Sequence, residues 1–135
     1  MSKKNRYVKY INPLEHKKTK TLFSYFLESC KANGNGIIIH PQVGHFRHDD
    51  FGNAIGEDFA RKLANGGLKL TDYSVEVCAA RTINKHSRAS VYFAWWPLGS
   101  DLEIIEKHSW ADGFIACRDK KDLELLTHKF DFIEV

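Results

Sequence analysis

The sequence lacks the features that mark secreted or membrane-spanning proteins. It has no apolar run approaching the roughly 20 residues that cross a bilayer, and residues 1–18 contain no apolar signal-peptide core. The three cysteines, Cys30, Cys78 and Cys117, lie far apart and form no C-x-x-C pair, which disfavours a disulfide framework and a cysteine-based zinc site. We therefore expect a cytoplasmic protein without a membrane partner.

Several sequence motifs of nucleotide and ester chemistry are also missing. The chain has no G-x-G-x-x-G, no Walker A motif and no G-x-S-x-G nucleophile elbow. No internal repeat, low-complexity segment or linker divides its 135 residues. We expect a single domain over residues 1–135.

Positive charge is concentrated near the start of the chain. The formal net charge is +3, but residues 1–20 carry seven basic and one acidic residue, while the remainder carries thirteen basic and sixteen acidic residues. The body is therefore slightly acidic. Residues 1–6 form a basic N-terminus that is a candidate for flexibility.

Hydrophobic spacing alternates between helical and extended segments along the chain. Predicted helices cover residues 19–31, 51–63, a segment that starts at Ser100, and 119–128. Predicted strands cover residues 7–11, 36–40, 74–80, 90–96, 113–117 and 130–135. Ser100 and Glu103 have capping-box spacing, which predicts Ser100 as the N-cap of its helix.

This alternation predicts an α/β fold of two or three layers with a mixed sheet. The strands at 74–80 and 90–96 follow one another through the sequence RTINKHSRA, which predicts a central hairpin with a long basic connection. An α+β arrangement is the alternative, because short apolar runs do not fix the strand order.

Ligands of parallel sheets bind where strands end and helices begin. The sequence predicts such junctions at 40–50, 96–100 and 117–119. Helix N-termini favour phosphate, and an indole ring can stack on a base. Our leading prediction is a small cytosolic protein that binds a phosphate-bearing ligand, either a nucleotide or a nucleic acid. The predicted ligand contacts are Arg47, Trp95, Trp96, Ser100 and Arg118.

The densest group of ionisable residues lies at 40–50. His40, His45, His48 and Asp49 are candidate ligands for a divalent metal, whose bound water could hydrolyse a phosphodiester or a nucleotide. In this alternative the protein is a metal-dependent phosphodiesterase or nuclease, with His45, His48 and Asp49 as catalytic residues. The simpler alternative is that Asp49 or Asp50 caps the next helix while the histidines face solvent. Whether the chain is an enzyme stays open.

The His48-Asp49 doublet is similar to the signature of the HD-type phosphohydrolases. That family is all-helical, whereas here the doublet lies between a predicted strand and a predicted helix. No residue role is therefore carried over from it.

A second basic segment precedes the two adjacent tryptophans. Arg81, Lys85, His86 and Arg88 lie without an acidic residue among them and are candidate nucleic-acid contacts. The alternative is a solvated hairpin tip.

Trp95 and Trp96 are neighbours in a predicted strand, so we expect them to point to opposite faces of the sheet. An exposed tryptophan would favour a third interpretation, a non-enzymatic interaction protein or inhibitor with a protein partner.

Residues 37–70, IIIHPQVGHFRHDDFGNAIGEDFARKLANGGLKL, resemble the opening of TIR-type domains. The shared features are a strand, a polar loop, a helix with F-A-x-x-L, and then G-L. The resemblance covers about a quarter of the chain. The glutamate-bearing helix motif expected later in TIR enzymes has no counterpart in this sequence, so the resemblance implies only the local strand, loop and helix order.

Overall fold

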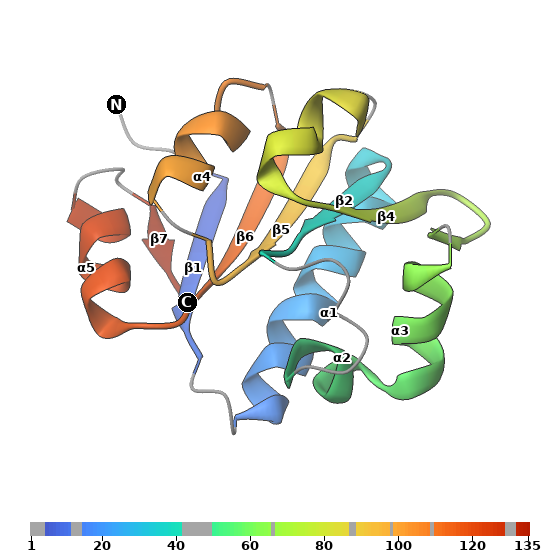
Figure 1. Cartoon of the computed structure of the whole chain (residues 1–135), viewed down its shortest axis with the longest axis horizontal. Coiled ribbons are helices and arrows are strands. Elements are labelled where there is room, and N and C mark those ends of the chain that lie inside the picture. Colours follow the sequence, from blue (N-terminus) through green and yellow to red (C-terminus); the bar gives the residue numbers. More distant parts are fainter. Residues whose placement is uncertain are drawn as a thin grey trace.

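Seven strands form one sheet between two layers of helices in the computed structural model (Figure 1). The structure describes residues 5–11, 15–41, 50–65, 67–86, 89–97, 99–108, 110–128 and 132–135. The strands are β1 (Arg6–Tyr10), β2 (Gly36–Ile39), β3 (Leu68–Lys69), β4 (Ser74–Cys78), β5 (Val91–Trp95), β6 (Asp112–Cys117) and β7 (Ile133–Glu134). The helices are α1 (His16–Asn33), α2 (Asp50–Ile55), α3 (Glu57–Ala64), α4 (Gly99–Ile105), α5 (Lys120–His128) and the 3-10 helix η2 (Ala80–His86).

The sheet order is β3-β4-β2-β5-β6-β1-β7, and every neighbouring pair is parallel except β3 and β4. The predicted α/β fold with a mixed sheet is confirmed. The predicted central hairpin is wrong, because β2 lies between β4 and β5 and is parallel to both. All four residues of β2 are buried, so this apolar strand takes a central position and the chain must cross over it from β4 to β5.

The two faces of the sheet carry separate hydrophobic cores. On one face, side chains of α1, α2 and α3 pack against the sheet, and on the other face η2, α4 and α5 do so. Figure 1 shows these two groups of helices on either side of the strands. All five residues of β5 are buried, as expected of a strand that is covered on both faces. Within the described chain, no helix has the length and hydropathy needed to cross a bilayer.

Aromatic contacts dominate the core on the α1 side. The ring of Phe23 lies 5.7 Å from Phe26, 5.7 Å from Phe51 and 5.8 Å from Phe93, measured between centroids. The Phe23 contacts to Phe51 and Phe93 are edge-on, an arrangement that the quadrupoles of the aromatic rings favour. The predicted helix 19–31 is confirmed by this packing, since its apolar positions Phe26 and Cys30 are completely buried.

Two predicted helix boundaries differ in the structure. The segment 51–63 is two helices rather than one, and the break falls at Gly56, whose φ of 101° no interior helical residue adopts. Ser100 is the second residue of α4, so it is not the N-cap that the capping-box spacing predicted. Short β3 follows Gly67, where φ is 98°, and pairs antiparallel with β4 at the sheet edge.

A buried ion pair closes the amino-terminal edge of the sheet. Arg6 is 6% exposed, and its Nε donates to both carboxylate oxygens of Glu106, at 2.7 and 3.0 Å. The guanidinium carbon lies 5.7 Å from the ring centroid of Tyr92, which is fully buried beneath it. A Cβ at Gly113 would come within 2.5 Å of the Tyr92 ring and 2.8 Å of Arg6 Cδ, so glycine is what lets these side chains approach β6.

We expect Gly113→Ala to destabilise the fold by about 1–3 kcal/mol, because the added methyl would overpack the Tyr92 ring. Urea unfolding of Gly113→Ala, Tyr92→Ala and the double variant measures this effect as a double-mutant cycle. If the clash is the cause, the double variant is more stable than the sum of the two single effects predicts. Strict additivity would contradict the steric explanation.

All three cysteines are free and buried in the two cores. Burial raises the pKa of Cys30 and Cys117 to about 12 and that of Cys78 to about 11, from an ordinary value of 9.0. For each thiol the largest cause is desolvation, which disfavours the thiolate.

Thiol labelling tests this packing. At pH 8 the shift of Cys78 alone lowers the thiolate fraction roughly 100-fold, so native labelling by a thiol reagent should be at least that much slower than labelling in urea. Fast native labelling at pH 8 would contradict the burial.

Because the folded pKa values lie above the unfolded value, the contribution of the thiols to stability is complete below about pH 9 and declines as the pH rises through 11 to 12.

Candidate ligand-binding cleft

The connections that leave β2 and β5 run to opposite faces of the sheet. The chain after β2 leads to α2, whose Phe51 lies in the core on the α1 side. The chain after β5 leads to α4, whose Leu102 and Ile105 lie in the opposite core. Because β2 and β5 are neighbours, their carboxyl ends form a point where the connections diverge, and such points are where α/β sheets bind ligands.

A cleft of about 310 Å³ occurs at this point. It is formed by the ends of β2, β4 and β5 together with the exposed side of α4. This volume lies at the small end of the range for sites that take a small organic molecule. The lining residues are Ile39, His40, Pro41, Ala79, Ala80, Arg81, Trp95, Pro97, Asp101 and Ile104.

Three ionisable side chains meet the apolar walls of the cleft. His40 directly follows β2 and is 2% exposed, with its backbone N–H donating to the Cys78 carbonyl at 3.0 Å. Arg81 is exposed and comes from the first turn of η2, where the chain folds back from β4 over the sheet. Asp101 is half-buried on α4. The cleft thus offers a cation, a carboxylate and an imidazole beside apolar surface.

Trp95 and Trp96 lie on the same side of the sheet, contrary to the expected alternation. Trp96 has a φ of 49°, so the extended conformation ends at Trp95 and the next side chain swings back. The two indoles stack with centroids 4.5 Å apart and planes at 22°, and both pack in the core that contains Phe51. Trp95 is 1% exposed, which makes it a wall of the cleft rather than an open stacking surface.

The two indole Nε1–H groups are buried donors without a hydrogen-bond acceptor among the described residues. A buried donor without an acceptor costs about 1–3 kcal/mol. Both residues lie at the end of β5, and Trp95 lines the cleft.

Arg118 contacts Trp96 rather than the cleft. It follows β6, is exposed, and holds its guanidinium carbon 5.3 Å from the centroid of the Trp96 ring. An exposed cation–π contact of this kind contributes about 0.5–1 kcal/mol. The arginine can therefore exchange this contact for a phosphate at little cost.

The structure brings together some of the predicted site residues and not others. His40, Arg81 and Trp95 line one cleft, and Trp96 with Arg118 lies next to it. Ser100 is exposed on α4 and does not line the cleft. Arg47, His45, His48, Asp49 and Arg88 lie outside the described residues, as do the side chains of Lys85 and His86.

Sequence reasoning missed Asp101 and Ile104 as lining residues, and it included Pro97 only as part of the 96–100 junction. The junction at 96–100 was predicted to face the ligand, and extending it by one helical turn would have included Asp101 and Ile104. Arg81 was predicted as a contact on a hairpin tip. It reaches the cleft instead because the connection is a crossover that starts at the end of β4.

Two kinds of chemistry gain no support from the described part of the chain. No group of three or more His, Cys, Asp or Glu side chains in it is placed to hold a metal ion. Cys78 precedes the cleft at the end of β4, but burial raises its pKa to about 11, so its thiolate is scarce at neutral pH.

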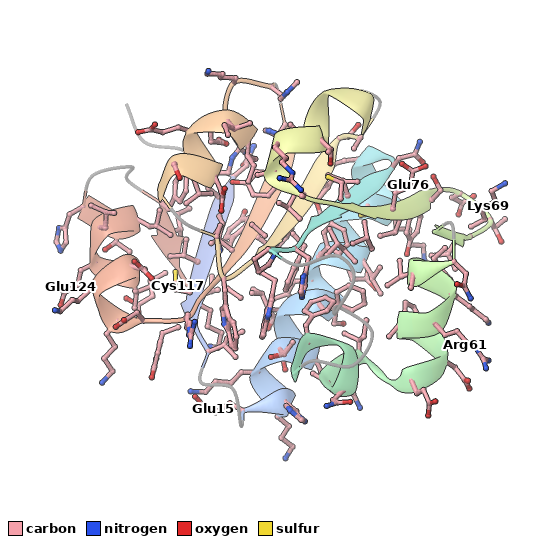
Figure 2. All side chains as sticks on the ribbon, viewed as in Figure 1. Glu15, Arg61, Lys69, Glu76, Cys117 and Glu124 are labelled. Carbon is pink, nitrogen blue, oxygen red and sulfur yellow. The ribbon has the colours of Figure 1, made fainter. Side chains whose placement is uncertain are left out.

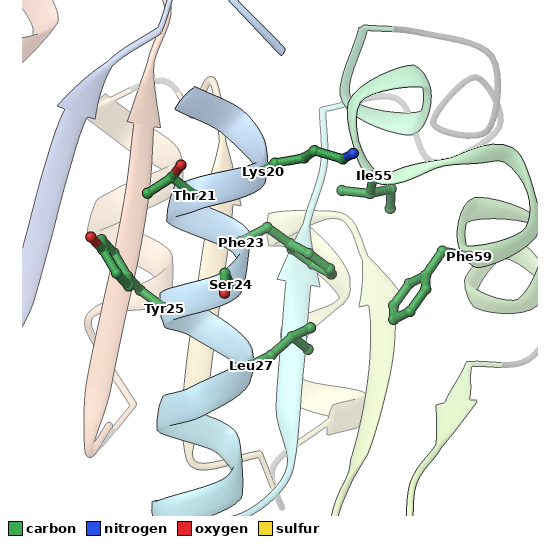
Figure 3. Close-up of a pocket in the computed structure, with 8 residues that line it drawn as sticks. All are labelled: Lys20, Thr21, Phe23, Ser24, Tyr25, Leu27, Ile55 and Phe59. Atoms are coloured by element: carbon green, nitrogen blue, oxygen red, sulfur yellow. The ribbon is translucent and has the colours of Figure 1, made fainter. Parts of the chain in front are cut away.

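A second hollow, of about 470 Å³, lies on the helix layer (Figure 3). Phe23 and Leu27 of α1 face Ile55 and Phe59 across it, and Lys20 extends along its rim. Its surface is mostly apolar and it lies away from the strand ends. This composition suits an apolar side chain better than a phosphate.

Comparisons of the chain with protein-family models, with curated proteins and with solved structures found no significant match. The candidate site therefore rests on its own geometry and chemistry.

Proposed function

We propose that the protein binds a phosphate-bearing ligand of the nucleotide class in the cleft at the carboxyl ends of β2, β4 and β5. The observation that carries this proposal is the coincidence of the cleft with the point where the connections of β2 and β5 diverge. Arg81 supplies the only permanent cation among the described residues that line it.

The chemistry of the walls matches the parts of a nucleotide. Arg81 is a planar donor suited to phosphate oxygens. Pro97, Ile104 and Ala80 offer apolar contact to a base or sugar. Asp101 is an acceptor for sugar hydroxyls or base amino groups. A purely inorganic anion would use the arginine and leave the apolar walls without a role.

A nucleotide should stabilise the protein against heat. At a concentration ten times its Kd, a ligand of the folded state raises the melting temperature by about 4 °C or more for a chain of this size. We expect this from at least one of AMP, GMP, CMP and UMP, and we expect Arg81→Ala to weaken its binding roughly ten-fold in calorimetric titration.

Arg61→Ala is the matched control. It removes another exposed arginine from α3, on the other side of the sheet (Figure 2), where an ion pair with Asp58 is lost. This variant should bind nucleotides as the wild type does. No thermal shift with any of the four nucleotides, or equal losses in Arg81→Ala and Arg61→Ala, would contradict the proposal.

A metal-dependent phosphodiesterase is the second candidate, and the position of His40 favours it. His40 is the one member of the proposed ligand set within the described residues, and it lines the cleft. His45, His48 and Asp49 complete that set. Adding Mn²⁺ to the thermal measurements tests it, because a bound metal stabilises the fold in the same way as any other ligand.

A non-enzymatic interaction protein remains the third prediction, with the hollow of Figure 3 as its surface.

A further inference from the structure

Two cation–aromatic pairs continue the carboxyl edge of the sheet beyond the cleft. Arg118 lies over Trp96 at the ends of β6 and β5, with 5.3 Å between guanidinium carbon and ring centroid. Lys120, the first residue of α5, lies over Tyr10 at the end of β1, with 5.9 Å between Nζ and ring centroid. Both cations are exposed, and both rings are half-buried.

The strand order sets these pairs one after another in a line along the edge, with the Trp96–Arg118 pair toward the α1 face of the sheet and the Tyr10–Lys120 pair toward the α5 face. Passing from β4 through β2, β5 and β6 to β1, the carboxyl edge presents Arg81, then the cleft, then Trp96 with Arg118, and finally Tyr10 with Lys120. Four strand spacings of about 4.8 Å give the line a length of about 19 Å. A stacked strand at about 3.4 Å per nucleotide would cover that length with about six nucleotides. Cys117, which is labelled in Figure 2, marks this edge at the end of β6.

A single strand of nucleic acid needs this combination of groups. Cations follow its phosphates and aromatic rings stack on its unpaired bases, without reading the sequence. A duplex hides its base faces and presents two phosphate rows, whereas the described part of this edge presents Arg81, Arg118 and Lys120, and the last two lie over aromatic rings. Asp101 and Asp119 lie along the same edge, and their carboxylates limit how many phosphates it can hold.

We propose that the ligand is a single-stranded nucleic acid, with one nucleotide in the cleft and its neighbours lying over Trp96, Arg118, Tyr10 and Lys120. This inference rests on the proposed function, because the cleft is one position along the strand. Arg118 and Lys120 leave their aromatic partners to contact phosphates, and the uncovered faces of Trp96 and Tyr10 take bases. The contact of each cation with its ring is the ligand-free arrangement of the same surface.

The experiment compares one nucleotide with eight. Fluorescence anisotropy measures the binding of labelled U8 and dT8, and calorimetry measures UMP and dTMP, with the full chain in each case. We expect at least one octamer to bind ten-fold or more tightly than its mononucleotide. A labelled duplex of the same length should bind more weakly than the better octamer. The U8 and dT8 arms distinguish RNA from DNA.

The variant Arg118→Ala/Lys120→Ala tests the line itself. Both side chains are exposed, so the fold should tolerate their loss. We expect octamer affinity to fall about ten-fold and the slope of log K against log salt to become shallower by about 1.4, which corresponds to two phosphates lost. Mononucleotide affinity should change less than two-fold. Arg61→Ala/Lys62→Ala, which removes the same two charge types from exposed positions of α3, should leave octamer binding unchanged.

The outcomes separate this inference from the proposed function. If mononucleotides bind and the octamers bind no more tightly, the extended line is wrong and the cleft stands alone. If both double variants lose octamer affinity equally, the interaction is non-specific and the line is also wrong. If neither mononucleotides nor octamers bind, the proposed function itself is contradicted.

Discussion

The opposite exits of β2 and β5 are the constraint on which the candidate site depends. Parallel neighbours whose connections both left on one face would have their ends covered by adjacent helices. Here α2 packs on one face and α4 on the other, and among the described residues the cleft opens between them at the strand ends. The cleft is therefore a consequence of the strand order. Residues at the strand ends line it because the connections begin there and leave on opposite faces of the sheet.

The same order gives the two edges of the sheet different chemistry. At the amino-terminal edge, Arg6 and Glu106 form a buried pair above Tyr92, and this internal contact occupies the guanidinium. At the carboxyl edge the arginines are exposed and meet either the cleft or an aromatic ring. Arg6 is therefore needed for the stability of the fold, because removing one member of a buried ion pair leaves the other charge uncompensated. The described arginines of the carboxyl edge are exposed, and the proposed function uses Arg81 to bind the ligand.

Much of the fold could be predicted from local pattern, and the failures have identifiable physical causes. The apolar run of β2 predicted a strand covered on both faces, and the spacing of Phe26 and Cys30 predicted α1, because each signal reports burial along one segment. Pairing across the sheet is not a local property, so the sequence between β4 and β5 could be interpreted as a hairpin although β2 separates them. The predicted alternation of Trp95 and Trp96 failed because the positive φ of Trp96 ends the strand one residue early. The cleft lies at the edge where the ligand contacts were predicted, whereas Arg81 was assigned to a hairpin tip, because its place in the cleft follows from the crossover.

Backbone amide spectra during titration with a nucleotide test the central claim most directly. The ligand is whichever of AMP, GMP, CMP and UMP gives the largest thermal shift. When it is added to isotopically labelled protein, the account predicts that the largest shifts fall on the amides of His40, Ala80, Arg81 and Asp101, with the Trp95 indole N–H shifting alongside them. Residues of α1 and α3 around the hollow of Figure 3 should stay nearly unchanged. Shifts centred on Phe23, Leu27 and Phe59 instead, with the strand ends unaffected, would contradict a ligand site at the carboxyl edge.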